Sequence, residues 1–429
     1  MGHGVGRLRR WVEACDCGVC GGGDPEKLLR IPSLEGMEKT EAVAPRSSRS
    51  AYDHAIRNIG VRMITVETGE ELERALSKRT AMIYLSAGRA TEAGPLSLEN
   101  VARMAKPWGI PILVDAAEEG LTIPNVHLAR GATVVAYSGG KAICGPQCAG
   151  LLLGKKDLLL SAWQASSPHH GPGRDNKVGR EETVGMVAAV EAWVKRDHKA
   201  EWAKWLGYLD TIAKRMGTIA GVSTRVVEPT GLSNRSPSLA ISWDPEKLHV
   251  TGEELAEVVA RTKPRIALGA RRDGVDITAW MMQPGNDRVV AERLFALLTE
   301  KRVPRGAPAA PSGNLSGRWD VHISFFSSRS RHGWTLEQDG NGLKGTHKGE
   351  FSARDIFGTI EGGEVKLRST ESVPGDSISF TFSGSLSGDR LAGRVHMGEY
   401  LTASFVAVRH VDAAGKGSIL VPGGPPLSN

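Results

Sequence analysis

Hydrophobic and polar positions follow two different periods along this chain, and the change comes near residue 303. Between residues 24 and 302, short apolar runs alternate with segments whose apolar positions recur every three or four residues. Such alternation is typical of a parallel sheet with helical crossovers. Beyond residue 316 the period falls to two and the segments shorten. That pattern is typical of antiparallel strands, so we expect an α/β part followed by an all-β part.

The most apolar stretch, residues 110–154, predicts three buried strands in quick succession. They cover residues 112–115, 132–137 and 149–153. Because they are apolar on both faces, we expect them in a parallel sheet covered by helices. Asp115 ends the first strand, and the segment from Ser138 to Lys141 follows the second. In open α/β sheets ligands bind at the carboxyl ends of strands, so Asp115 and Lys141 are candidates for one site.

Lys141 and Asp115 have the chemistry that pyridoxal 5'-phosphate (PLP) requires. A lysine that follows two glycines at a strand end can form a Schiff base with the aldehyde of the cofactor. An aspartate on a neighbouring strand can keep a pyridinium nitrogen protonated, which makes the ring an electron sink. Ala116 and Ala117 are small enough for a flat ring to lie against the backbone, and Ser138 can hydrogen-bond the phosphate or the phenolic oxygen. From spacing alone, a capping aspartate and a solvated lysine are equally good interpretations.

Three segments carry a resemblance to a known family: VDAAEE, AYSGGKAICGPQCAGLLLGKKDLL and KVGREETVGMVAAVE. They resemble the selenocysteine-synthase-like group of fold-type I PLP enzymes. The similarity is greatest to its branch of D-glucosaminate-6-phosphate ammonia lyases and L-seryl-tRNA(Sec) selenium transferase-like proteins, and it extends from about Asp24 to about Arg302. The resemblance implies that Lys141 holds PLP covalently and that Asp115 pairs with the pyridinium nitrogen. It also implies a homodimer, because fold-type I enzymes usually build each site across a subunit interface.

Four further residues are weaker candidates for substrate binding. Arg49 lies in a segment similar to a family motif in which a histidine commonly stands where this chain has Ser48. Its guanidinium can hold a planar carboxylate or a phosphate. His170, Arg174 and Lys177 lie in a Gly/Pro-rich loop before a helix, and such loops often carry ligand contacts. A surface arginine and a solvated histidine are the alternatives.

The changes in pattern divide the chain into expected domains. They are a disordered N-terminus (1–23), a PLP-binding large domain (24–220), a small α+β domain (221–302), a linker (303–316), an antiparallel β-barrel or sandwich (317–411) and a disordered tail (412–429). The hairpin signals DGNG, EGGE and SGDR join short strands in the all-β part. No catalytic constellation is evident there.

The N-terminus departs from the family pattern. Relatives place a Ser/Thr-Gly-Ala loop at a helix start, where backbone N–H groups hold the cofactor phosphate. Residues 1–23 do not supply that loop, so we expect a chain shortened at this end and doubtful activity. Cys15, Cys17 and Cys20 resemble half of a zinc site, but no second Cys/His pair follows at a partnering distance. We therefore expect no metal.

Composition narrows the function further. No apolar run among the 429 residues is long enough to span a membrane, and the five sparse cysteines suit a reducing, cytoplasmic compartment. The net charge of +6 forms no basic block, which suits a small anionic substrate and makes a nucleic-acid partner unexpected. The leading hypothesis is a PLP-dependent lyase that eliminates a β-substituent from an amino acid or amino sugar acid. A selenium transferase acting on seryl-tRNA and a non-catalytic scaffold of the same fold are the alternatives.

Overall fold

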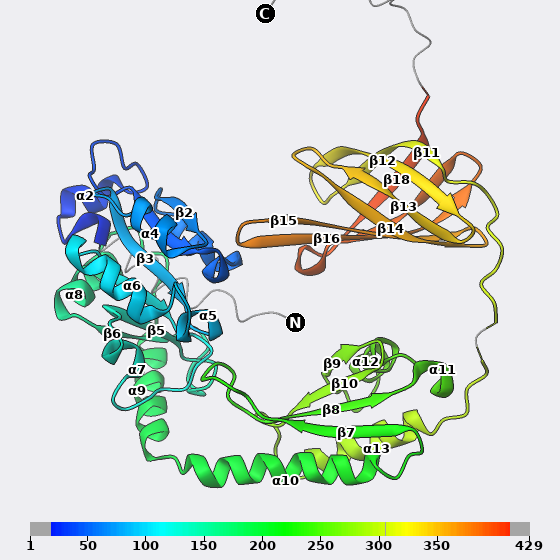
Figure 1. Ribbon diagram of the computed structural model, residues 1–429, viewed down its shortest axis with the longest axis horizontal. Helices are drawn as coiled ribbons and strands as arrows, with labels where there is room; N and C mark the ends of the chain where they lie inside the picture. The colour runs from blue at the N-terminus through cyan, green and yellow to red at the C-terminus, as the bar shows by residue number, and fades with distance from the viewer. Residues whose placement is uncertain (1–18, 305, 412–429) are drawn as a thin grey trace, which may run out of the picture. The chain divides into compact units, whose positions relative to one another are not determined.

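The computed structural model describes residues 19–304 and 306–411, which form two compact units that meet in sequence at Arg305 and Gly306. The first unit contains two β-sheets and the second a closed barrel (Figure 1). The expectations for residues 1–18, including Cys15 and Cys17, and for residues 412–429 lie outside the described residues. Within the described ranges, no helix combines the length and the apolar character needed to cross a bilayer.

A six-stranded sheet with the order β2-β1-β3-β4-β5-β6 forms the centre of the first unit. Its strands are β1 (Glu41–Pro45), β2 (Arg62–Val66), β3 (Thr80–Ser86), β4 (Ile112–Asp115), β5 (Val134–Ser138) and β6 (Gly150–Gly154). The five strands from β1 to β5 are parallel, but β6 pairs antiparallel with β5. The expectation of a wholly parallel central stretch is therefore wrong at β6. The segment that joins β5 to β6 contains no helix, and a parallel neighbour needs a longer crossover.

Helices cover both faces of this sheet. They are α2 (Pro25–Arg30), α3 (His54–Arg57), α4 (Gly69–Ala75), α5 (Arg89–Glu92), α6 (Leu98–Ala105), α7 (Val126–Ala129), α8 (Lys156–Gln164) and α9 (Arg180–Lys195), with 3-10 turns η1 (Arg46–Ser48), η2 (Ala51–Asp53) and η3 (Lys106–Trp108). Successive residues of β4 enter two different cores, Leu113 one and Ile112 and Val114 the other. Because both faces are covered, the strand is apolar until it ends at Asp115.

A four-stranded antiparallel sheet follows, with the order β7-β8-β10-β9. Its elements are α10 (His198–Met216), β7 (Val222–Val227), β8 (Ser238–Trp243), α11 (Pro245–Leu248), α12 (Gly252–Arg261), β9 (Gly269–Arg271), β10 (Gly274–Thr278) and α13 (Asn286–Leu298). Leu239 and Ile241 of β8 pack with Leu209 of α10 and Leu294 of α13 in a core of their own. The mixture of strands and helices predicted for this region is present.

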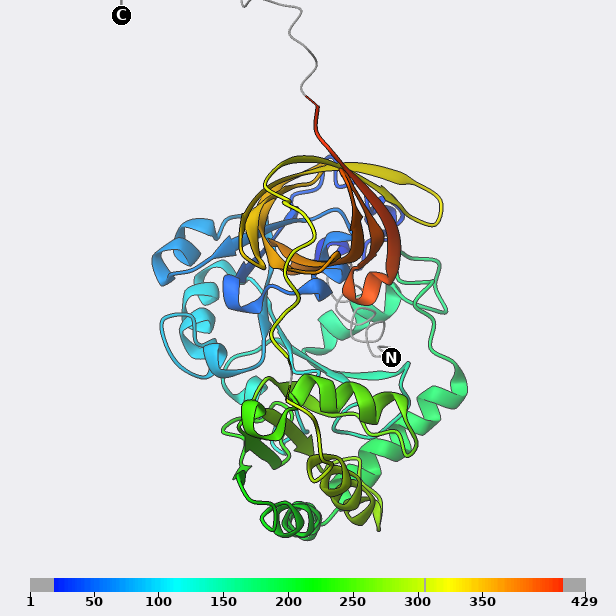
Figure 2. The same cartoon turned by 90° about the vertical axis from the view of Figure 1, so that its right-hand side faces the viewer.

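The second unit is a closed barrel whose eight strands follow one another in sequence order. They are β11 (Gly317–Ser324), β12 (Arg329–Asp339), β13 (Gly342–Lys348), β14 (Ala353–Glu361), β15 (Glu364–Val373), β16 (Asp376–Ser387), β17 (Arg390–His396) and β18 (Thr402–Arg409), with the turn η4 (Gly398–Tyr400) before β18. The last strand pairs with the first, and Figure 2 looks into the resulting ring. Buried residues alternate with exposed ones along the strands, as the period of two predicts. The barrel, rather than the sandwich, is therefore correct.

Candidate active site

Asp115 ends strand β4 with a buried carboxylate, of which only 7% of the residue surface is exposed. Its Oδ2 accepts a hydrogen bond from the hydroxyl of Tyr84 (2.8 Å) and its Oδ1 accepts one from the backbone N–H of Ala117 (3.0 Å). Burial raises the pKa of Asp115 to about 6, although both hydrogen bonds and the charge of Lys141 act against that rise. The carboxylate is thus fixed in orientation, and its environment lacks a full positive countercharge.

Lys141 follows strand β5 in a tight loop that needs glycine. A Cβ at Gly139 would lie 2.8 Å from the backbone oxygens of Pro146 and Ala149, so no larger residue fits. The backbone N–H of Gly145 closes the loop by donating to the carbonyl of Gly139 (2.7 Å). At its end, the Nζ of Lys141 donates to a carboxylate oxygen of Glu118 (3.3 Å). The two candidates that the strand ends suggested are therefore brought together.

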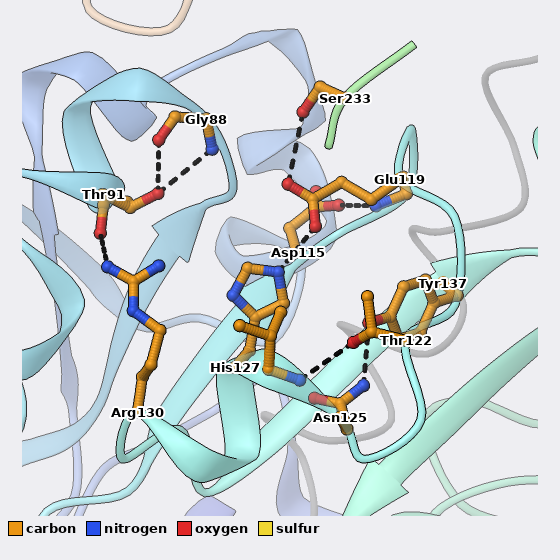
Figure 3. A network of polar contacts seen from close by, with 12 residues as sticks. Gly88, Thr91, Asp115, Glu119, Thr122, Asn125, His127, Arg130, Tyr137 and Ser233 are labelled. Atoms are coloured by element: carbon orange, nitrogen blue, oxygen red, sulfur yellow. Dashed lines mark hydrogen bonds and ion pairs between the residues drawn. The ribbon is translucent and has the colours of Figure 1, made fainter. Parts of the chain in front are cut away.

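Glu118 and Glu119 connect this strand edge to the loop between β7 and β8. Asn234, with a φ of 48°, donates from its backbone N–H to the Glu118 carbonyl (2.9 Å) and from Nδ2 to the Glu118 carboxylate (2.8 Å). Ser233 donates to Glu119 (3.4 Å), and the buried Glu119 also lies 2.6 Å from Nε2 of His127 (Figure 3). Sequence reasoning did not single out Glu118 or Asn234. The available signal was the pair of glutamates just after the strand-end aspartate.

A cavity of about 1120 Å³ opens beside Lys141 and is lined by both parts of the first unit. Glu118 and Lys141 line it from the six-stranded part, and Trp280 follows β10. Trp193 of α9 lines it as well, and its indole N–H donates to the carbonyl of Leu121 (3.1 Å). The cavity walls thus combine aromatic surface with charged groups, which suits an organic ion.

The remaining predicted cofactor contacts, Ala117 and Ser138, are both buried at the same strand ends. Arg49 is near this edge too, because the hydroxyl of its neighbour Ser48 accepts from the backbone N–H of Ser86, which pairs with Asp115. The Arg49 guanidinium is itself buried against the Asp53 carboxylate and the Thr65 hydroxyl. Those contacts already occupy much of its donor capacity.

The loop between α8 and α9 carries the other three predicted substrate contacts. His170 and Lys177 are exposed, and Arg174 is half-buried with its Nε–H unpaired among the described residues. The side chains that line the cavity around Lys141, as far as the chain is described, do not come from this loop. Cys20 is buried, and the described ranges hold no cluster of three His, Cys, Asp or Glu side chains placed for a metal.

Asp115 and Lys141 fit PLP by the chemistry of their groups. A buried carboxylate with a raised pKa gains most from a cationic N–H partner, and a pyridinium provides one. A primary amine at the cavity wall is the group that an aldehyde cofactor requires. The side chains present therefore suit this cofactor.

The two sheets of the first unit have the fold of fold-type I PLP enzymes. Its structure is similar to that of D-glucosaminate-6-phosphate ammonia-lyase, with a TM-score of 0.59 and 21% identity, covering 68% of this chain and 80% of the other. In sequence, 211 residues are 29% identical to D-glucosaminate-6-phosphate ammonia lyase of Salmonella typhimurium, covering 47% of this chain and 54% of that enzyme. A 5'-C-glycyluridine monooxygenase-decarboxylase of a Streptomyces species is 27% identical over 308 residues, covering 67% of this chain and 73% of that protein.

These comparisons confirm the predicted resemblance and the predicted fold class. The matched segment spans about half the length of the Salmonella typhimurium enzyme. No family model matches the chain.

Proposed function

We propose that this chain is a PLP-dependent lyase acting on an amino acid or amino sugar acid. One observation carries the proposal: a buried carboxylate and a lysine amine, from two neighbouring strands, meet at the wall of one cavity. The similarity to an ammonia lyase of amino sugar phosphates supports this class of substrate, and D-glucosaminate 6-phosphate is the first compound to test.

Each group at the strand ends has a separate task in this proposal. Bound PLP supplies an aldehyde for the substrate amine and a protonated ring that withdraws electrons from the substrate Cα. Asp115 accepts the ring N–H and holds that proton in place. Lys141 holds the cofactor and then takes the proton from Cα, a role that requires its free amine to face the substrate. Loss of a β-hydroxyl as water, followed by hydrolysis, then yields a keto acid and ammonia.

Cationic groups around the cavity support an anionic substrate. Arg196, Lys199 and Arg235 line it, and Arg196 is paired with Glu201 (3.6 Å). Lys199 and Arg235 are therefore suited to a distal carboxylate or phosphate. Substrate contacts from Arg49, His170, Arg174 and Lys177 remain predictions.

Assembly and location belong to the same proposal. We infer a homodimer in the cytoplasm, with neither a nucleic-acid partner nor a membrane. Support comes from the fold-type I architecture, the sparse cysteines and the thinly spread net charge of +6. The domain limits at residues 24–220, 221–302 and 317–411 also stay part of the proposal.

An absorbance spectrum of the purified chain with added PLP tests the function directly. We expect a visible band that borohydride bleaches, absent from Lys141→Ala and kept by the matched control Lys156→Ala, whose lysine is exposed at the start of α8. Ammonia release from D-glucosaminate 6-phosphate should follow the same pattern. If the unmodified chain gives no such band, or if Lys141→Ala keeps it, the proposal fails.

A further inference from the structure

The two ends of the barrel are built differently. At one end, tight turns at Gly340, Gly362 and Gly388 join neighbouring strands. The segment that enters the barrel closes this end, because Leu315 is fully buried and its backbone N–H donates to Oε1 of Gln338 (2.7 Å). The interior behind it is apolar and contains the buried side chains Trp319, Leu336, Leu343, Ile360, Val365 and Leu391.

The opposite half of the barrel has a polar interior. Nδ1 of His332 lies 2.7 Å from Nε2 of His347, and Nδ1 of His347 lies 2.6 Å from the hydroxyl of Ser369; all three residues are buried. Beside them Arg354, whose side chain is only 7% exposed, forms an ion pair with Glu371. Burial, with the Arg354 charge, lowers the pKa of His347 to about 3 and also lowers that of His332. Both imidazoles are therefore neutral at neutral pH.

Two buried N–H groups in this polar half have no acceptor among the described residues: Nε1 of Trp334 and Nε of Arg354. Trp334 pairs with His347 across β12 and β13, and His347 pairs with Arg354 across β13 and β14. Both donors thus lie on one belt of the inner wall. A buried donor left unpaired costs about 1–3 kcal/mol, so two on the same belt indicate an acceptor that enters the barrel.

The loops at this end carry exposed apolar side chains. They are Phe326, Phe351, Val373, Tyr400 and Leu401, at or beside the connections β11–β12, β13–β14, β15–β16 and β17–β18. Aromatic rings continue the apolar surface inward, since Phe382 packs against both Trp334 and Phe405 with ring centroids 4.8 and 5.1 Å apart. An apolar rim above a floor of unpaired donors fits a molecule that enters with its polar head first.

We propose that this half of the barrel binds a small amphiphilic carboxylate. Its two oxygens accept hydrogen bonds from Trp334 Nε1–H and Arg354 Nε–H, and its apolar tail lies against rim side chains such as Phe351. Hydrogen bonds to an ionised acceptor are stronger than neutral ones, so a carboxylate satisfies both donors better than a neutral group. The site is separate from Lys141 and does not depend on the proposed lyase activity.

Titration of the full-length chain with 11-(dansylamino)undecanoic acid tests the site, with dansyl emission as the readout. We expect saturable binding of one probe per chain. Trp334→Phe keeps an aromatic ring but removes the donor, so affinity should fall about tenfold. Phe351→Ser, at a rim residue that is 94% exposed, should also weaken binding. Its matched control is Phe357→Ser on the outer wall of β14, where the side chain is 56% exposed, and this variant should bind normally.

Further arms separate the possible failures. Lys141→Ala should bind the probe as well as the unmodified chain, which distinguishes this site from the PLP site. The methyl ester of the probe should bind more weakly, because it has lost its charge. Arg354→Met combined with Glu371→Gln should weaken binding without leaving one charge unpaired, and thermal melting verifies that each variant folds. No saturable binding, equal affinity for the ester, or unchanged affinity in Trp334→Phe would each overturn the proposal and assign the two donors to water.

Discussion

Asp115 and His347 are both buried titratable side chains, one at the end of a sheet strand and the other in the middle of a barrel strand. Burial raises the pKa of Asp115 and lowers that of His347, because in each case it disfavours the charged form. Their neighbours differ. Lys141 partly offsets the cost for Asp115, whereas Arg354 adds to the cost for His347. A strand end beside a cavity can recruit a counterion, and a barrel wall keeps its imidazole neutral.

The largest effect is expected from Asp115→Asn, which tests the strand-end half of this comparison. The amide cannot hold the ring nitrogen protonated, so kcat should fall by about 10²–10⁴. The raised pKa means that the folded chain without PLP binds more protons than the unfolded chain between pH 3.8 and about 6. Its stability contribution is therefore lost as pH rises through that window, so Asp115→Asn should raise the Tm of the cofactor-free protein at pH 7. A lower Tm at pH 7, or retained activity, would contradict this role.

His347→Gln tests the barrel half through its opposite pH dependence. With a pKa of about 3, His347 in the folded barrel binds fewer protons than in the unfolded chain between pH 3 and 6.5. The barrel should therefore lose stability as pH falls through that window, and the substitution should reduce the loss. The measurement is urea unfolding at pH 4 and pH 7, followed by the fluorescence of the buried Trp319 and Trp334. An identical pH dependence in the variant would show that His347 is not responsible.

Gly120→Ala tests how tightly the segment after Asp115 is held. A Cβ at Gly120 would lie 2.7 Å from the ring of Trp193, so the indole must move and weaken its bond to Leu121. We expect a loss of about 1–3 kcal/mol in the free energy of unfolding of the first unit, by urea titration. The matched control is Gly207→Ala on α10, where a Cβ meets no other atom and helix propensity should increase stability by about 0.5–1 kcal/mol. Equal effects at the two sites would contradict the packing argument.

The smallest effect is expected from Glu118→Gln, which removes the ion pair to Lys141. Both side chains are partly exposed, so the pair is worth at most about 1 kcal/mol and kcat/KM should fall about two- to fivefold. Asn234→Ala should give a similar change by releasing the same carboxylate from the other side. Glu201→Gln is the control, since Glu201 lines the same cavity but pairs with Arg196. A kinetic effect in the control as large as in Glu118→Gln would argue against a specific link to Lys141.

Local patterns were enough to predict the elements that carry the proposed site. The apolar run that ends at Asp115 and the glycines before Lys141 are contiguous, so their strand ends could be recognised without knowledge of the fold. The short turns between β12 and β17 could be recognised for the same reason. The antiparallel direction of β6 could not, because it depends on how the chain returns to the sheet. Glu118 and Asn234 are 116 positions apart, and no local period encodes such a contact.

Closure of the barrel determines how this unit can meet other molecules. Each strand from β11 to β18 has a hydrogen-bonded neighbour on both sides, whereas the outer strands β2 and β6 of the first unit have only one each. A neighbouring chain therefore finds no free backbone edge along the barrel to extend by strand addition. Such a module can be carried at the end of an enzyme at high cellular concentration without seeding fibres, and its contacts are left to side chains and loop tips.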